Sequence, residues 1–177
     1  MGAVIIVSNY LVQFPINKFN LQNLLTYGAL SYPITFLITD LANRRFGKKK
    51  ARKLGYFGFI FGIILTLFVS TNFKDIISIR IALGSGTAFL IAQLVDVEIF
   101  QRLRNNIWFV APVTSSVLGS IIDTFLFFSI SFLGTGVPWI TLAFGDLFVK
   151  ILMAFLMLIP FRLLMIKISD FNVKTYL

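Results

Sequence analysis

The stretch that decides the fold is WFVAPVTSSVLGSIIDTFLFFSISFL, residues 108–133, in which Asp123 is the single charged side chain. A transmembrane helix needs about 20 consecutive, mainly apolar residues, and this stretch is long enough to supply them. Its small residues recur at helical spacing, which favours close packing against a neighbouring helix. We therefore predict that residues 108–133 form a membrane-spanning α-helix.

The composition extends this prediction to the rest of the chain. Of its 177 residues, 58% are hydrophobic and 13% are charged, and the mean hydropathy is +0.90. Soluble domains usually carry about 45–50% apolar and about 25% charged residues, so this chain has too few polar side chains to cover a surface in water. Six spans of about 20 residues would use about 120 residues, which leaves no room for a second, soluble domain.

The predicted fold class is an all-α integral membrane protein, a six-transmembrane-helix bundle in a single domain, residues 1–177. Apolar stretches bounded by charges or turn residues set the approximate limits of the spans. We predict spans at residues 1–15, 26–43, 54–72, 77–97, 108–133 and 138–166. The first is expected to insert rather than to be cleaved as a signal peptide, because it lacks a basic leading region and a small-residue cleavage site.

The positions of the cations predict the orientation. Residues 44–53, RRFGKKKARK, place seven Lys and Arg residues in the predicted loop after the second span. Short cytoplasmic loops are rich in these residues, and Arg102, Arg104 and the cations of the C-terminal tail fall on the same side. We expect a multi-pass protein of the cell inner membrane (plasma membrane) with both termini cytoplasmic. Topology then accounts for the net charge of +9 without a nucleic acid partner.

Residue types that are missing exclude several kinds of chemistry. The chain contains neither Cys nor His, which excludes disulfides, Cys/His zinc sites, thiol nucleophiles and triads with an imidazole base. An enzyme acting on lipid head groups would need paired acidic metal ligands on one helix face, whereas Asp96 and Glu98 face different ways. We expect no catalytic residue, no metal site and no cofactor.

Carboxylates inside spans are the candidate functional groups. Each ionisable residue in a span costs about 2.5–3.5 kcal/mol, and such residues usually face a cavity or a partner. By helical spacing, Phe36, Asp40 and Asn43 share one face, and Gln93 and Asp96 share another. The carboxylates that qualify are Asp40, Asp96, Glu98, Asp123 and Asp146.

Local pairing separates the structural candidates from the others. Glu98 can pair with Arg102 at i, i+4, and we interpret this pair as interfacial. Asp146 and Lys150 have the same spacing, although Lys150 could instead reach a carboxylate on another helix. Asp123 has no cation within a turn of its own helix, which makes it the strongest candidate for contact with a ligand.

The residue types indicate a class of ligand. The chain has 21 Phe, 5 Tyr and 2 Trp residues, so aromatic rings surround the carboxylates. A carboxylate accepts two parallel hydrogen bonds from an N–H and an amino group, as on the Watson–Crick edge of guanine, and rings can stack on the faces of such a molecule. A carrier of hard metal cations remains an alternative, because these cations also prefer oxygen ligands.

Four blocks of the sequence resemble one transporter family. They are YPITFLITDLAN (residues 32–43) followed by RFG (45–47), AQLVDVEIFQRLR (92–104), WFVAP (108–112) through Asp123 and Thr124, and Lys150. In this order they are similar to the motifs of the queuosine precursor transporter family, also called the vitamin uptake transporter (VUT) family. The resemblance covers essentially the whole chain.

The resemblance implies a function and a set of site residues. It implies a transporter for the deazaguanine precursors preQ0 and preQ1, serving queuosine salvage, with a bundle similar to the substrate-binding components of energy-coupling-factor vitamin transporters. The expected partners are this small-molecule substrate and membrane lipid. Phe36 and Trp108 are expected to stack on the substrate, and Arg102 and Arg104 to close the cytoplasmic end or only to set topology. The expected substrate-binding residues are Asp40, Asn43, Gln93, Asp96, Asp123 and Lys150.

Two alternatives keep a binding site but change its use. The chain could be a substrate-capture subunit that needs a coupling module with an ATPase, docked through the Gly-rich runs at residues 55–62 or 84–86. It could also carry another small planar nitrogenous compound or a cation. Homo-oligomers are compatible with all of these alternatives.

Overall fold

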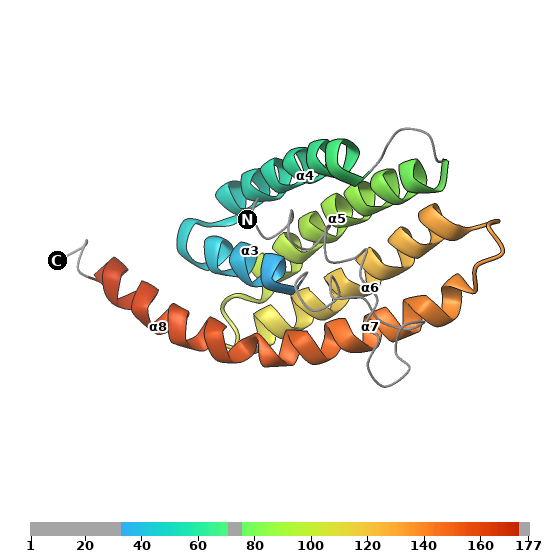
Figure 1. The fold of residues 1–177 in the computed structure, drawn as a ribbon. Helices are drawn as coiled ribbons and strands as arrows, with labels where there is room; N and C mark the ends of the chain where they lie inside the picture. Colours follow the sequence, from blue (N-terminus) through green and yellow to red (C-terminus); the bar gives the residue numbers. More distant parts are fainter. Residues whose placement is uncertain (1–32, 71–75, 174–177) are drawn as a thin grey trace.

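The computed structural model describes residues 33–70 and 76–173, and these residues are mostly helical (Figure 1). The predicted span 1–15 lies outside the described residues, as does the first part of the span 26–43. The all-helical prediction is confirmed for the part of the chain that the structure describes. The helices are α3 (Pro33–Phe46), α4 (Lys48–Ser70), α5 (Ile76–Leu103), α6 (Val110–Phe132), α7 (Trp139–Leu156) and α8 (Leu158–Val173).

Long apolar helices confirm that the chain is a membrane protein with several candidate spans. Within the described residues, three segments are long and apolar enough to cross a membrane: Ile79–Leu103, Val110–Phe132 and Trp139–Lys167. They match the predicted spans 77–97, 108–133 and 138–166. Large apolar side chains on the last segment point outward, and Phe148 is 71% exposed and Ile159 is 65% exposed. In a bilayer, such side chains contact lipid.

The basic stretch 44–53 is helical, which corrects the prediction of a loop there. Helix α3 ends at Phe46 and α4 begins at Lys48, so Gly47 alone joins them. Gly47 has φ +80°, and its N–H donates to the Asn43 carbonyl at 2.9 Å. Glycine, which has no Cβ, adopts this left-handed conformation at low cost. The conformation ends α3, so that a single residue separates the two helices. The cations of residues 48–53 therefore form the first turns of α4.

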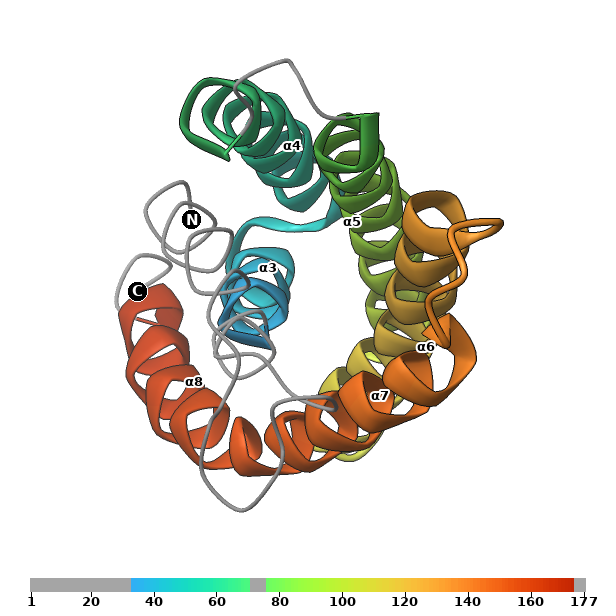
Figure 2. The ribbon, with the colours of Figure 1, turned by 45° about the vertical axis from the view of Figure 1, so that its right-hand side comes forward.

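The predicted span 138–166 is interrupted at Met157, between α7 and α8. Pro160 lies in the first turn of α8 and explains the interruption. Proline has no N–H to donate, and its ring clashes with the carbonyl four residues earlier, which belongs to Leu156. The α7–α8 segment consequently bends around the other helices instead of running straight (Figure 2).

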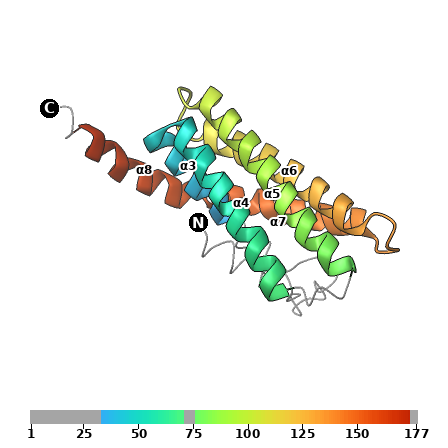
Figure 3. The same ribbon diagram turned by 90° about the horizontal axis from the view of Figure 1, so that it is seen from above.

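Helix α3 lies at the centre of the described bundle. It contacts each of the helices α4 to α8, which form an arc around it (Figure 2). Helices α4, α5 and α6 run side by side, and α8 extends past α3 (Figure 3). Because of this position, polar side chains on α3 meet those of α5 and α6.

Glycines allow the close approach of these helices. A Cβ on Gly119 would lie 2.9 Å from Cε1 of Phe36, so the glycine of α6 makes room for the aromatic ring of α3. A Cβ on Gly84 would lie 2.5 Å from Ser131 Oγ, and one on Gly86 would lie 2.5 Å from Ile63 Cγ1. Small residues at helix contacts are typical of membrane bundles. Gly84 and Gly86 thus serve packing between helices within the chain.

Candidate functional site

A buried polar cluster joins α3 to α5, and we call it the α3–α5 cluster. Each of its side chains is at most 2% exposed. Four come from α3 and two from α5, and four of the six are residues that the sequence predicts for the site. The cluster consists of Thr35, Thr39, Asp40, Asn43, Gln93 and Asp96.

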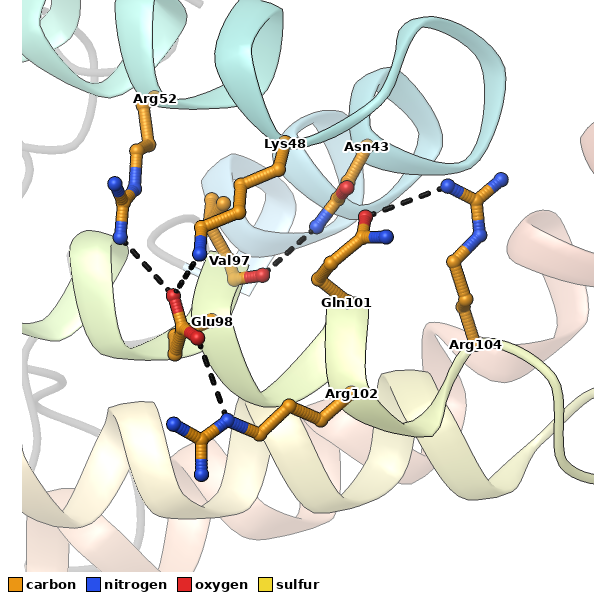
Figure 4. Close-up of polar contacts among 8 residues, drawn as sticks. All are labelled: Asn43, Lys48, Arg52, Val97, Glu98, Gln101, Arg102 and Arg104. Atoms are coloured by element: carbon orange, nitrogen blue, oxygen red, sulfur yellow. Dashed lines mark hydrogen bonds and ion pairs between the residues drawn. The ribbon is translucent and has the colours of Figure 1, made fainter.

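The amides of the cluster hold the two helices together. The Thr39 hydroxyl donates to Gln93 Oε1 at 2.7 Å, and Gln93 Nε2 donates to Thr35 Oγ1 at 3.4 Å. Asn43 Nδ2 donates to the Val97 carbonyl at 3.0 Å (Figure 4). Buried hydrogen bonds of this kind fix the relative position of two helices. Gln93 and Asn43 therefore position the carboxylates that lie between them.

Asp40 on α3 and Asp96 on α5 adjoin the bonded pairs Thr39–Gln93 and Asn43–Val97, and they lie close enough for their charges to affect each other. Ser115 of α6 donates to Asp40 Oδ1 at 3.4 Å. Both oxygens of Asp96 are buried and lack a hydrogen bond with good geometry, and no ion pair among the described residues includes either carboxylate. Burying an acid without such partners is costly, and an intramembrane acid usually marks a functional site.

A small cavity adjoins Asp40. Its space of about 10 Å³ corresponds to about one water molecule. Phe36 and Asp40 of α3 line it, together with Ser116 and Ser120 of α6. Met157, at the interruption between α7 and α8, forms part of the wall. The cavity therefore combines an acidic group, an aromatic ring and hydroxyls next to the bend of the α7–α8 segment.

A second buried polar group lies between α6 and α7. Lys150 Nζ is 2.8 Å from Asp123 Oδ2 and 2.6 Å from Asp146 Oδ2, and the Thr124 hydroxyl donates to the same Asp146 oxygen at 2.9 Å. The i, i+4 pair of Asp146 and Lys150 is confirmed. The cation that Asp123 lacks on its own helix comes from α7, because Lys150 also reaches across to α6.

The basic end of the bundle is organised around Glu98 (Figure 4). Glu98 pairs with Arg102 at 3.3 Å, as predicted, and also with Lys48 at 2.5 Å and Arg52 at 3.0 Å. The last two contacts were not predictable as long as residues 44–53 were expected to be a loop. Arg104 Nη1 donates to Gln101 Oε1 at 3.3 Å. Glu98 thus offsets the positive charge of Lys48 and Arg52, which lie at the N-terminal end of α4, where the helix dipole is also positive.

Trp108 lies apart from the cavity. The guanidinium of Arg162 is 4.7 Å from the centroid of its ring, and the ring packs against the core formed by Phe100, Ala111 and Phe161. Trp108 is absent from the residues that line the cavity beside Asp40. The structure therefore brings Phe36, but not Trp108, next to the candidate carboxylates.

A family model described as "Putative vitamin uptake transporter" matches residues 26–165. The chain belongs to this transporter family. The match includes every residue of the α3–α5 cluster and both sides of the α6–α7 ion pair. Membership makes the chain a membrane transporter and not an enzyme.

Relatives with curated names are similar over most of the chain. A "Probable queuosine precursor transporter" of Haemophilus influenzae is 34% identical, over 89% of this chain and 79% of that protein. The "Queuosine precursor transporter" of Escherichia coli is 32% identical with the same coverage. The "Probable queuosine precursor transporter" of Bacillus subtilis is 26% identical, over 76% of this chain and 67% of that protein. No solved structure matches.

Sequence reasoning missed three hydroxyl residues of the site. Thr35 and Thr39 precede Asn43 at intervals of four, so a polar stripe on α3 was visible in the sequence. Ser115 offered no comparable signal, because the sequence contains several serines near it and only the packing of α6 on α3 selects this one.

Proposed function

We propose that this transporter takes up queuosine precursor deazaguanine bases, preQ0 and preQ1, across the inner (plasma) membrane for salvage into tRNA. The names of the relatives support this substrate, and they cover most of the chain at 32% and 34% identity. The one structural observation that carries the proposal is the buried pair Asp40 and Asp96, with Phe36 beside Asp40 and no hydrogen bond of good geometry to either oxygen of Asp96.

The chemistry of the pair fits the edge of a guanine-like base. Such a base presents an N–H and an amino group side by side, and a carboxylate can accept both. The unpaired oxygens of Asp96 are acceptors of the required kind, and the ring of Phe36 next to Asp40 offers a face for stacking. The cavity beside Asp40 has room for about one water molecule in this structure, so the helices must separate to admit a base. The bound base would then replace the missing hydrogen bonds of the buried acid.

The remaining predicted residues take supporting positions in this proposal. Gln93 and Asn43 hold α3 against α5, and in this proposal they would also contact the base from the sides. Asp123 and Lys150 are kept among the proposed substrate-binding residues because Ser120, one turn before Asp123, lines the cavity beside Asp40. Trp108, packed under Arg162, would contribute near the basic end rather than at the carboxylates.

We propose a topology of six spans with both termini cytoplasmic, in a bundle like that of energy-coupling-factor substrate-binding components. The α3–α4 turn and the α5–α6 connection lie at one end of the bundle, opposite the α6–α7 connection (Figure 1). The first end gathers the cations of residues 44–53 together with Arg102 and Arg104, as expected for a cytoplasmic end. These two arginines would close that end.

The proposal is tested by uptake into cells that lack precursor synthesis. Cells expressing the chain should form queuosine in their tRNA when labelled preQ0 or preQ1 is supplied. Asp96→Asn should lose uptake by about tenfold or more at low substrate concentration, because an acceptor becomes a donor. Asp170→Asn, which removes a carboxylate near the end of the chain, is the matched control. Queuosine formation without the chain, or wild-type uptake by Asp96→Asn, would contradict the proposal.

A second experiment separates a self-sufficient transporter from a capture subunit. The purified chain alone is placed in proteoliposomes and supplied with labelled base. Because Gly84 and Gly86 pack against Ser131 and Ile63 within the chain, we expect uptake without a coupling module. Binding without transport would support the capture subunit instead.

A further inference from the structure

Asp40 and Asp96 differ from the other carboxylates of the site, because no cation among the described residues pairs with them. Asp123, Asp146 and Glu98 each lie within 3.3 Å of a cation, whereas no described Lys or Arg forms an ion pair with Asp40 or Asp96. The two side chains are also fully enclosed, with Asp40 2% and Asp96 0% exposed.

The described groups that face the pair are neutral. Helix α6 contributes the hydroxyls of Ser115 and Ser116, and the two aspartates are the titratable groups that α3 and α5 bring to this point. The wall of the adjoining cavity on the α7–α8 side is apolar and includes Met157. Among the described residues, no group around the pair would offset the charge of two ionised carboxylates.

Two carboxylates in contact do not both ionise in a medium of low dielectric, because their repulsion and the loss of hydration add up. An ionised carboxylate that is buried also requires donors, and Asp96 receives none with good geometry. One proton placed between the two groups removes both problems. It cancels one charge and provides the donor that the other oxygen needs.

We propose that Asp40 and Asp96 share one proton, and that this proton makes the pair a combined donor and acceptor for the substrate. The choice of ligand rests on the proposed function. On a guanine-like edge, a carbonyl oxygen stands beside the N–H and amino donors. The ionised member of the pair accepts from the two donors, and the protonated member donates to the carbonyl oxygen. A pair without the proton would offer acceptors alone and repel that oxygen.

The proton itself is tested without any ligand. Infrared spectra of the full chain in lipid nanodiscs at neutral pH should contain the C=O stretch of a protonated carboxyl group. Asp40→Asn and Asp96→Asn should each lose this band, because the new amide N–H donates to the remaining carboxylate and replaces the proton. Asp170→Asn should retain it. Absence of the band in the wild type, or its persistence in either site variant, would overturn the proposal.

The role of the proton in recognition is tested with 7-deazaguanine as the probe. Its affinity for the purified chain is measured as the pH is raised through the range in which the infrared band disappears. Affinity should fall by about tenfold or more across that range, since a buried carbonyl oxygen loses its donor. Unchanged affinity across it would overturn the role in recognition. Absence of binding at every pH, with the band present, would count against the proposed function and leave the shared proton supported.

Discussion

Lys150 of α7 reaches across to α6, where its ammonium nitrogen lies 2.8 Å from Oδ2 of Asp123. The same nitrogen holds Asp146 at 2.6 Å, so one buried cation serves two carboxylates. Their side chains are at most 15% exposed, so one buried cation lies against two carboxyl groups. Because the cation is shared, its removal and the removal of one carboxylate have opposite effects on the charge balance.

This asymmetry gives a prediction about stability. Lys150→Met leaves Asp123 and Asp146 buried without a cation, and breaking a buried pair in this way costs about 3–5 kcal/mol. Asp123→Asn leaves Lys150 paired one to one with Asp146, so its cost should be much smaller. Thermal unfolding of the purified variants in detergent measures the difference. Equal destabilisation by both substitutions would contradict a shared cation.

The specificity of uptake should follow the edge that the carboxylates read. Guanine-like deazapurines present an N–H and an amino group together, so they should compete with labelled preQ1 for uptake. Adenine, which presents an acceptor in place of that N–H, should compete at least about tenfold less well, because a buried acceptor is left unpaired. Competition is measured in cells expressing the wild-type chain. Equal competition by adenine would argue against recognition of this edge by Asp40 and Asp96.

Features that depend on local sequence could be predicted, and those that depend on which helix faces meet could not. Length and hydropathy located residues 108–133 as a span, and i, i+4 spacing identified the pair of Asp146 and Lys150. The reach of Lys150 to Asp123 depends on the packing of α6 on α7, for which the sequence contains no direct signal. The tight turn at Gly47 was not predicted, because a run of cations is typical of a loop and the sequence does not reveal the positive φ of Gly47.

The orientation of the chain gives a prediction for reporter fusions. A reporter after Lys53 should be cytoplasmic and one near Thr135 should be external, because seven cations lie in residues 44–53. Arg80, a cation at the opposite end, has a structural explanation, since it donates to the carbonyls of Ile130 and Leu133 at the end of α6. Cations favour that end of a helix through its dipole. The reverse result at both fusion sites would contradict the orientation.

The contact between Gly119 and Phe36 gives the last prediction. A Cβ at Gly119 would lie 2.9 Å from the ring of Phe36, while a Cβ at Gly55 would lie 3.7 Å from Gln93 Cβ, which is an ordinary contact. Gly119→Ala should therefore displace the ring that lines the cavity and cost about 1–3 kcal/mol, as overpacking usually does. Gly55→Ala should remain close to the wild type, and it controls for the general effect of alanine in a helix.

Thermal unfolding in detergent and uptake of labelled preQ1 measure the two consequences of Gly119→Ala separately. Because Phe36 lines the cavity beside Asp40, we expect uptake to fall together with stability. Phe36→Leu in the Gly119→Ala background removes the ring that clashes and should recover part of the stability while uptake stays low. Recovery of both would show that the ring serves packing alone, and unchanged stability in Gly119→Ala would show that α3 and α6 do not pack as closely as described.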